Sequence, residues 1–577
     1  MKSPWSFPTS PRSPYKVIER LRLIKHLDGN IYNIDLQKEV GKLIINEDST
    51  HKPGLDSSSS TLDFTGRDYL TRAPQKLGLI FTPSVREKKQ FLFTEQGNNL
   101  IMSENMQYIL QRQIAKVQYP SPMKVRGTSH LEIIPLTTVI TILKATKDLS
   151  RTELSIFVIT IEKYTDINKA INEILLFREN IKLIKGNIKR REFRKKTIYK
   201  KIEDYYKDEK IKLRERRGKI TTKKDFLRTK SAIHKDYSDA TFRYFIMTGL
   251  FKINKNSRLE ISKINEKDAD FLLKTIGLKP KKHNLNKEKY IKNYLGIEKS
   301  VILFTDDIKN IINKFKYLKN LCFETGVNIN LDNIESEFNN ETSLDAKKNL
   351  ISNLQRHLIT TRMNKLIVKL GNREQSDFDE ILHHFEDLSD KQSEILDKPL
   401  QYEYNFFRAF SFIGDAENII PSLNFDEDVN PLNTTSNAPD LIIEYKTFVL
   451  VVEVTLSTGQ RQYESEGAPV FRHVGKCQKE YDKPVFGLFV ADKLDVNMPV
   501  EFLSRAMVHT SIYNGRVRIL PINRTNFELF FTKIYTNKLK SNDIYIIFNN
   551  LLGDESLTKY QKLGEEKWVE DIEKNLS

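Results

Sequence analysis

Apolar residues in the last quarter of the chain gather in two runs, 441–445 and 448–455, with the polar pair Lys446-Thr447 between them. Valine, isoleucine and phenylalanine dominate both runs, and a short polar break between such runs predicts a β-hairpin. The second run is apolar at nearly every position, which is typical of a strand buried on both faces. Glu453 lies inside that run. A buried carboxylate is unfavourable unless a positive or hydrogen-bonding group meets it, so Glu453 is the first candidate for chemistry.

Around this hairpin the pattern alternates between helices and strands. An aromatic-rich stretch, 402–412, has helical spacing, and its aromatic stripe is predicted to be core. Runs 484–491 and 516–522 predict two further strands, with helical segments between and after them. Alternating strands and helices predict an α/β sheet, so residues 399–577 are expected to form one α/β domain.

The first 130 residues combine short helical stretches with short apolar runs. A helix near residues 65–73, the run 77–82, a second run at 91–93 and another helix follow one another in the order of a winged helix. Another kind of small α/β unit is the alternative. Residues 1–130 are therefore expected to form a winged-helix-like subdomain.

Helical spacing continues over residues 133–178, where Ser150 and Glu153 have the capping-box pattern of a helix N-terminus. The order of these helices fits either a helix-turn-helix or a plain helical bundle. A further helix is expected to end at Gly249 before a strand, closing a second subdomain over residues 131–253. Residues 254–398 are mostly polar with helical spacing and are expected to be a helical linker. The expected fold class is therefore multidomain α+β.

Charge narrows the choice of partner. The chain has 93 Lys and Arg against 76 Asp and Glu, a net charge of +17, which favours a polyanion: nucleic acid first and an anionic membrane surface second. The most basic stretch, 182–230, is interleaved with aromatic residues, and Lys189, Arg190 and Arg191 are expected to contact DNA phosphates. A solvated helix face is the alternative for that stretch.

Other sequence features set the expected compartment. Two cysteines are too few for a zinc site or a disulfide framework and fit a reducing compartment. No apolar run approaches the roughly 18 residues of a membrane span, and the N-terminus lacks a signal-peptide core. We therefore expect a cytoplasmic protein with no membrane partner.

Two carboxylates are expected to meet at the hairpin. Asp440 directly precedes the first strand, and Glu453 lies near the end of the second. Because the start of one strand lies beside the end of its partner, these side chains should converge, with Thr455 on the face of Glu453. Glu464 or Glu466 would add a third carboxylate from the following turn. Such a set without Cys or His ligands favours Mg²⁺; the alternative is a turn aspartate and an edge-exposed glutamate.

Specific strings of sequence resemble a known family. Pro439-Asp440 followed by Glu453-Val454-Thr455 resembles the PD-(D/E)xK nuclease core, with Thr455 where a lysine is usual. The continuation through E-S-E-x-x-P-V-x-R-H, residues 464–473, is similar to the AlwI family of type IIS restriction endonucleases, the branch of GAGTC-recognising nickases and cutters. Two further strings match this branch: Q-Y-P-S at 118–121 and D-A-T-x-R-Y-F-x-x-T-G-L-F at 239–251.

The resemblance implies a C-terminal PD-(D/E)xK nuclease domain that cleaves double-stranded DNA with Mg²⁺. It implies that Asp440, Glu453 and Glu403, the last from the preceding helix, hold the metal. Glu466 is preferred over Glu464 because it keeps the family's spacing. His473 is expected to orient water or to donate to a phosphate oxygen. Because threonine has no charge, His473 or Arg472 is expected to compensate for the missing lysine.

The resemblance also implies DNA recognition by the N-terminal region. Arg67, Asp68 and Arg72 are expected to read bases or hold phosphates, with Asp68 accepting from cytosine or orienting an arginine. Arg243 lies in the second matching string and is a further candidate.

Three functions remain open. The first is a type IIS endonuclease that recognises a short asymmetric site, GAGTC being a candidate, and cuts at a fixed distance outside it. The second is a nickase or the large subunit of a heterodimer, because cutting both strands needs a homodimer or a small nuclease subunit. The third is a non-catalytic DNA-binding regulator with a degenerate nuclease fold. A cognate DNA methyltransferase is an expected partner in the same restriction–modification system.

Overall fold

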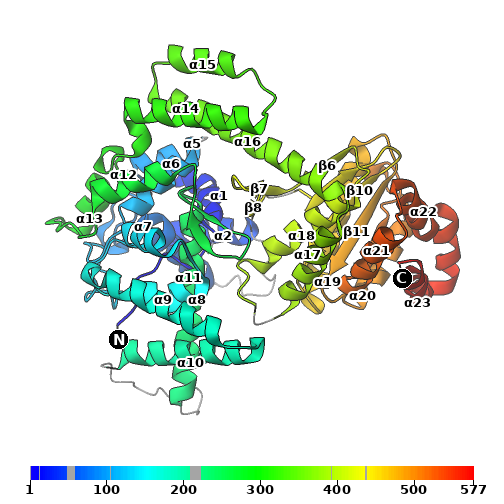
Figure 1. Cartoon of the computed structure of the whole chain (residues 1–577), viewed down its shortest axis with the longest axis horizontal. Helices are drawn as coiled ribbons and strands as arrows, with labels where there is room; N and C mark the ends of the chain where they lie inside the picture. The colour runs from blue at the N-terminus through cyan, green and yellow to red at the C-terminus, as the bar shows by residue number, and fades with distance from the viewer. Residues whose placement is uncertain are drawn as a thin grey trace. The chain divides into compact units, whose positions relative to one another are not determined.

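The computed structural model describes residues 2–11, 13–47, 59–103, 105–207, 222–390, 393–435 and 438–576. The chain divides into two compact units, Met1–Arg356 and His357–Ser577 (Figure 1). The division falls inside helix α16 (Leu344–Gly371), within the segment expected to be a helical linker. The linker is mostly helical, as expected, whereas the finer division into four segments stays a prediction.

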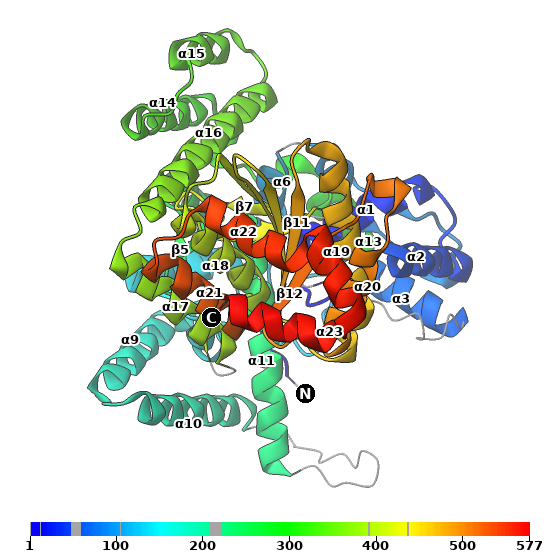
Figure 2. The ribbon, with the colours of Figure 1, turned by 90° about the vertical axis from the view of Figure 1, so that its right-hand side faces the viewer.

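Unit 1 is built mainly from helices. Its longer helices are α1 (Pro14–Ile24), α2 (Ile34–Glu47), α3 (Ser59–Thr71), α5 (Glu95–Met102), α6 (Met106–Ala115), α7 (Pro135–Thr146), α9 (Ile167–Leu183), α10 (Asn187–Tyr206), α11 (Lys223–Ile246), α12 (Glu266–Ile276), α14 (Ile308–Thr325) and α15 (Leu331–Asn340). Short helices are α4 (Ala73–Lys76), α8 (Arg151–Glu153) and α13 (Lys287–Tyr290). Helices α10 and α11 project from the body of this unit (Figure 2). In the described part of the chain, no helix is both long and apolar enough to cross a membrane.

Two small sheets accompany these helices. Strands β1 (Ile80–Phe81) and β2 (Leu92–Phe93) pair antiparallel between α3 and α5, so the expected order of helix, strand pair and helix is present. A second sheet has the order β3-β5-β4, formed by Asp148–Leu149, Leu259–Ile261 and Phe251–Ile253.

Local signals in unit 1 can be compared with the predictions. The capping box is confirmed: Ser150 Oγ accepts from the Glu153 amide, and Glu153 accepts from the Ser150 amide. The helix before Gly249 is also confirmed, since α11 ends at Ile246 and Gly249 has φ +68° before β4. The expectation of helix throughout 133–178 was wrong at two places. Residues 148–149 form β3 by pairing with the distant strand β5, and residues 159–163 leave the helix before Lys163 forms a bridge with Glu132.

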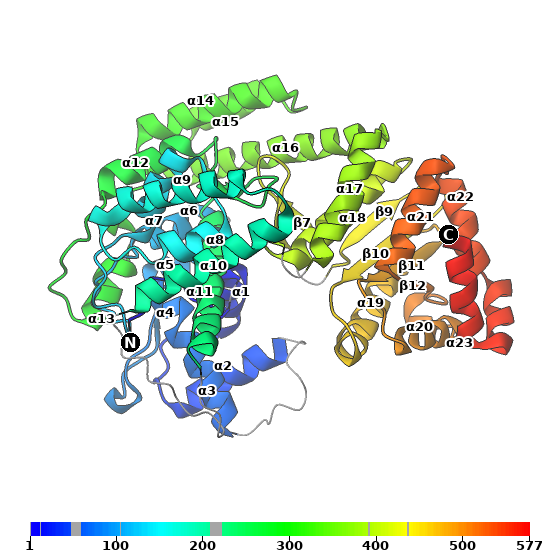
Figure 3. The ribbon, with the colours of Figure 1, turned by 60° about the horizontal axis from the view of Figure 1, so that its bottom comes forward.

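Unit 2 is organised around a five-stranded sheet in the order β12-β11-β10-β9-β6 (Figure 3). Its strands are β6 (Asn418–Pro421), β9 (Leu441–Glu444), β10 (Val449–Thr455), β11 (Val485–Ala491) and β12 (Ile519–Asn523), and β7 (Leu423–Phe425) and β8 (Pro431–Thr434) form a separate pair. Strands β10, β11 and β12 run parallel, whereas β9 is antiparallel to both β10 and β6. The predicted hairpin and both further strands are confirmed, the last beginning three residues later than expected.

Helices flank this sheet. They are α17 (Gln375–Ser389), α18 (Lys398–Ile413), α19 (Gln460–Glu480), α20 (Asn497–Met507), α21 (Arg524–Thr536), α22 (Ser541–Leu552) and α23 (Asp554–Leu576). Helix α18 packs on β6, β9 and β10, and α19 packs on β10 and β11. The aromatic stripe of α18 is core, as predicted: Phe406, Phe407 and Phe410 are all buried.

The segment containing Glu464 and Glu466 is a helix, so the prediction of a turn was wrong. The chain turns earlier, at Gly459 with φ +64°, and α19 begins at Gln460. The apolar positions that follow have helical spacing, with Val470, Val474 and Cys477 buried against the sheet side of α19. This geometry puts the two glutamates on different faces of one helix, because residues two apart on a helix do not face the same way.

Gly66 is expected to be essential for the stability of unit 1. A Cβ atom at this position would lie 1.9 Å from the carbonyl oxygen of Gln37 on α2, and one at Gly41 would lie 2.1 Å from that of Leu62 on α3. We predict that Gly66→Ala lowers the free energy of unfolding by about 2–3 kcal/mol because the two backbones must separate. Denaturant titration measures this, with Gly371→Ala as the control, since a Cβ there meets only an atom at 3.8 Å. Equal losses in both variants would contradict the prediction.

His234 gives unit 1 a pH-dependent stability. It is fully buried, with Nδ1 3.1 Å from the Ser155 carbonyl oxygen and Nε2 3.1 Å from the Tyr206 hydroxyl. Burial lowers the pKa of His234 from 6.5 to about 4. The unfolded chain therefore binds this proton first, and stability is lost as pH falls from about 6.5 towards 4, by up to about 3 kcal/mol. Unfolding of wild type and His234→Gln at several pH values tests this; a variant that loses as much as wild type over this range would refute it.

Candidate active site

The hairpin brings the predicted carboxylates to one cleft in unit 2. This carboxylate cleft has a volume of about 570 Å³. Its lining residues are Pro399, Tyr402, Glu403, Asp440, Glu453, Val454, Thr455, Leu456, Ser457, Thr458, Arg461, Glu466, Val470 and Phe489. Helix α18, the β9–β10 hairpin and helix α19 each contribute an acid, so segments distant in sequence form the site.

Asp440 and Glu453 form the floor of the cleft. The Val454 amide donates to Asp440 Oδ2 at 2.8 Å, which fixes the carboxylate across the start of the hairpin. Burial raises the pKa of Asp440 well above its usual range, and the charge of Glu453 raises it further. Burial and the charge of Glu466 raise the pKa of Glu453 to about 8. Two acids whose burial and charges oppose each other's ionisation are typical of a functional site.

Glu403 comes to these acids from α18. Its Oε2 atom is buried and has no hydrogen-bond partner. Burial raises the pKa of Glu403 well above its usual range, and the charges of Asp440, Asp397 and Glu453 add to this. Among the described residues, no three His, Cys, Asp or Glu side chains form a ready-made metal-ligand group. The cleft nevertheless offers only oxygen ligands from its acids, which suit a hard cation.

Glu466 lines the cleft and Glu464 does not. The Thr455 hydroxyl donates to Glu466 Oε1 at 3.2 Å and accepts from the Ser457 amide at 3.0 Å. Glu464 instead accepts from Gln460 on the exposed side of α19 at 2.8 Å. The preference for Glu466 over Glu464 thus agrees with the geometry, although its role stays a prediction.

The two groups considered as substitutes for the missing lysine do not line the cleft. His473 Nδ1 lies 2.6 Å from Glu453 Oε1, so the imidazole contacts this carboxylate without being one of the lining residues. Burial lowers the pKa of His473. Arg472 acts on Glu453 only through its charge, which lowers the pKa of that carboxyl.

Sequence reasoning missed Arg461. It is the basic residue among those that line the cleft, and it stands at the start of α19. Arg461 stands five residues before Glu466 in the sequence, and both belong to α19. Because a turn was predicted for this segment, the two residues were not expected to share a helix.

Arg67 and Arg72 have different partners on unit 1: the first contacts an aromatic ring and the second a carboxylate. The guanidinium of Arg67 stacks on the Phe64 ring, with 5.5 Å from Cζ to the ring centroid. Arg72 Nε lies 2.6 Å from Asp68 Oδ1, so Asp68 orients Arg72. The Arg-Asp pairing foreseen from the sequence therefore forms between Arg72 and Asp68.

The other predicted DNA contacts are spread over α10 and α11. Lys189 and Arg191 are exposed on α10, and Arg190 Nε donates to the Ile184 carbonyl oxygen at 2.8 Å. Arg243 on α11 is partly buried and lies 3.2 Å from Asp239. These side chains therefore do not share one site with Arg72.

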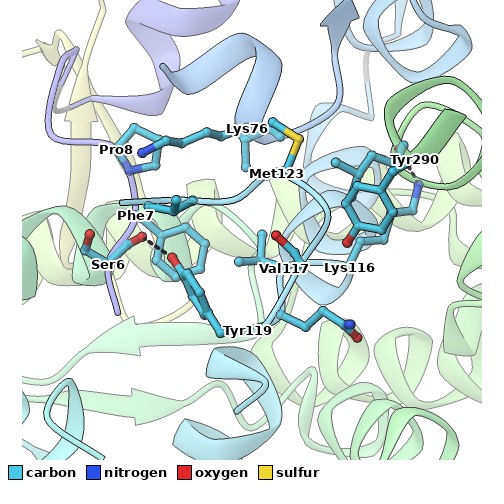
Figure 4. Close-up of a pocket in the computed structure, with 14 residues that line it drawn as sticks. Ser6, Phe7, Pro8, Lys76, Lys116, Val117, Tyr119, Met123 and Tyr290 are labelled. Atoms are coloured by element: carbon cyan, nitrogen blue, oxygen red, sulfur yellow. Dashed lines mark hydrogen bonds between the residues drawn. The ribbon is translucent and has the colours of Figure 1, made fainter. Parts of the chain in front are cut away.

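Arg72 lines a hollow of about 460 Å³ in unit 1. This basic hollow is lined by Ser6, Phe7, Pro8, Thr9, Thr71, Arg72, Gln75, Lys76, Met123, Val125, Arg126, Tyr237 and Lys287. A narrower pocket adjoins it and shares several of these residues. Figure 4 shows that pocket, with Lys76 extending past Met123 to Pro8, above Phe7 and Tyr119.

Comparison with protein families matches residues 75–529, more than half of the chain, to the family described as AlwI restriction endonuclease. Comparison with curated proteins found no match.

Two solved structures are similar in part. The small subunit (R.BspD6I2) of the heterodimeric restriction endonuclease R.BspD6I is 22% identical, with a TM-score of 0.29, over 34% of this chain and 100% of that chain. The BpuJ1 endonuclease binding domain, solved with pyrene- and phenanthrene-modified DNA, is 13% identical, with a TM-score of 0.32, over 48% of this chain and 89% of that chain.

Proposed function

Because this chain belongs to the AlwI restriction endonuclease family, we propose that it is a Mg²⁺-dependent type IIS enzyme. It binds a short asymmetric DNA sequence, with GAGTC as the first candidate, and hydrolyses phosphodiester bonds at a fixed distance outside it. The observation that carries this proposal is the convergence of Asp440, Glu453, Glu403 and Glu466 on one cleft. Unit 2 is then the PD-(D/E)xK nuclease and unit 1, with its winged-helix-like subdomain, the reader of sequence.

The donor set fits Mg²⁺. Glu403 Oε2 is a buried acceptor without a partner, and the acids around it repel one another. Such an all-oxygen set is stabilised most by a hard dication. Asp440, Glu453 and Glu403 would hold the ion, which would lower the pKa of a bound water and offset charge at the scissile phosphate.

The remaining residues of the site have supporting roles. His473 is a positioning residue, because its contact with Glu453 at 2.6 Å fixes the orientation of that carboxylate. Glu466 holds the Thr455 hydroxyl and adds negative charge beside Glu453. In this proposal Thr455 does not take over the role of a lysine, because its hydroxyl already serves Glu466 and the Ser457 amide.

DNA binding by unit 1 draws on its basic surfaces. Helix α10 exposes Lys189 and Arg191 to solvent, and Arg72 faces the basic hollow. Each phosphate that such groups neutralise releases counterions, so binding is expected to weaken steeply with salt. A cognate methyltransferase that protects the same site is the expected companion in the cell.

A nickase is the second candidate function. The carboxylate cleft holds a single set of converging acids, whereas two strands need two hydrolysis events. Cutting both strands therefore calls for a second copy of this chain or a small nuclease subunit.

Incubation of the purified protein with supercoiled plasmid, in Mg²⁺ or in EDTA, tests the proposal when the ends are mapped by run-off sequencing. Breaks at a fixed offset from one motif, absent in EDTA, are expected. Open circles alone indicate nicking, and linear DNA indicates cutting of both strands. Specific binding with no cleavage in Mg²⁺ or Mn²⁺ would instead favour a non-catalytic DNA-binding regulator.

A further inference from the structure

The basic hollow of unit 1 combines positive charge from three separate segments. Arg72 precedes the short helix α4 and Lys76 is its last residue, Arg126 belongs to the loop before α7, and Lys287 begins α13. None of the residues that line the hollow is acidic. A concavity of this size with several convergent cationic groups has the shape and charge of a site for an anion.

Burial disfavours the charged form of the lysines in this hollow when no anion is present. It lowers the pKa of Lys76, and the neighbouring charge of Arg72 lowers it further, with only partial compensation from Asp68. Burial also lowers the pKa of Lys287, offset in part by Glu87. When an anion enters the hollow, it stabilises the charged form of both lysines. Tyr237, Thr71 and Thr9 add hydroxyl groups to the lining, which suit phosphate oxygens.

We propose that the basic hollow binds a backbone phosphate of the DNA duplex, held by Lys76, Arg126 and Lys287 beside the Asp68-oriented Arg72. This inference rests on the proposed function and adds a site that positions DNA without reading its sequence. The phosphate would be fixed at the base of α4, directly after the helix that carries Arg67 and Asp68. Contacts of this kind set the register of a protein on DNA.

The salt dependence of DNA binding tests this site. Lys76→Gln and Lys287→Gln are expected to weaken binding to specific and unrelated duplexes alike. Each should reduce the slope of log affinity against log salt by about 0.9 for every phosphate that the variant no longer neutralises. Lys76→Arg is expected to keep the wild-type slope, and Lys299→Gln, an exposed lysine outside the hollow, serves as the matched control.

The outcomes separate this inference from the proposed function. Wild-type slopes in both glutamine variants would overturn the phosphate site and leave the nuclease proposal intact. Weaker binding of the specific duplex alone would overturn it in favour of base reading. Calorimetric binding of inorganic phosphate that depends on Lys76, with an unchanged DNA slope, would assign the hollow to a free anion. A wild-type protein that binds no DNA would overturn both proposals.

A separate observation concerns the carboxylate cleft. Hydrolysis forms a bond from a water oxygen to phosphorus and breaks the bond from phosphorus to the leaving sugar oxygen. The attacking water gives up one proton to solvent, and the leaving sugar oxygen takes up one proton from solvent. In the transition state, negative charge builds up on the non-bridging oxygens of the phosphate. A cation next to these oxygens lowers the activation barrier. Thr455 supplies no charge, and His473 is directed at Glu453. Arg461 lines the cleft, and its charge lowers the pKa of Glu466.

The geometry points to Arg461 as the group that supplies the missing positive charge to the scissile phosphate. A guanidinium suits this because it presents several donors to phosphate oxygens and never loses its charge. Its place at the start of α19 also puts it at the positive end of the helix. This inference too rests on the proposed function of the cleft.

Single-turnover cleavage tests the role of Arg461. Arg461→Gln is expected to slow the chemical step by about 10²–10³-fold, as when one preorganised donor to a developing oxyanion is removed. DNA affinity and the thermal stabilisation by added Mg²⁺ should stay at wild-type values, because neither depends on Arg461. Arg461→Lys should recover part of the rate, and Lys479→Gln, which removes an exposed positive charge from α19 outside the cleft, should cut normally. A wild-type rate in Arg461→Gln, or loss of the Mg²⁺-dependent stabilisation, would overturn the assignment.

Discussion

Replacing Asp440 with alanine is expected to reduce DNA cleavage by at least about 10³-fold and to leave specific binding at the wild-type level. Asp440 is half-buried, lies opposite Glu453 across the hairpin and accepts a hydrogen bond from the Val454 amide. Its loss removes a proposed metal ligand and the charge that would activate water. Binding should persist because the proposed DNA contacts belong to unit 1. Plasmid cleavage and a gel-shift assay with the same duplex measure the two effects side by side.

Controls separate a lost charge from a damaged fold. Asp440→Asn keeps the size of the side chain and an acceptor for the Val454 amide, so it should fold normally and remain inactive. Glu464→Ala removes an exposed carboxylate from the helix that carries Glu466 and should cut normally, because Glu464 lies outside the cleft. Wild-type cleavage by Asp440→Asn would show that this carboxylate has no role in the reaction.

The convergence of Asp440 and Glu453 was predictable because it depends only on local rules. Two apolar runs, the short polar break between them and antiparallel pairing fix which ends of the two strands meet. The register, with Val452 opposite Leu441, then brings Asp440 to the end of β10. Glu403 was proposed only through a family resemblance, because the packing of α18 against the sheet is not encoded in any short pattern.

The position of each residue around helix α19 determines which of Arg461, Glu464 and Glu466 line the cleft. A turn after β10 leaves Glu464 and Glu466 equivalent, whereas a helix from Gln460 sends them to different faces. The same helix turns Arg461 into the cleft, which the predicted turn concealed. The basic hollow was out of reach for another reason: Arg72, Arg126 and Lys287 are far apart in the chain, and only tertiary packing brings them together.

Replacing Glu403 with glutamine is expected to raise the stability of the metal-free protein while lowering cleavage by about 10²-fold or more. Without a cation, Glu403 is a buried carboxyl whose pKa is raised by burial and by Asp440, and one of its oxygens has no partner. An uncharged amide of the same shape removes the repulsion, so the thermal midpoint in EDTA should rise. Active sites that keep mutually repelling charges for catalysis are often less stable than variants without those charges.

The response to Mg²⁺ distinguishes this explanation from a purely structural role for Glu403. Ligand that binds only the folded state raises the thermal midpoint, and the increment grows with ligand concentration. Wild type should therefore gain stability from Mg²⁺, and Glu403→Gln should gain clearly less, so that the two midpoints approach each other at high Mg²⁺. Glu464→Gln should respond as wild type does, because its carboxylate faces solvent on α19. If Glu403→Gln were less stable than wild type in EDTA and equally stabilised by Mg²⁺, Glu403 would be a packing residue. The metal would then be held by Asp440 and Glu453 without it.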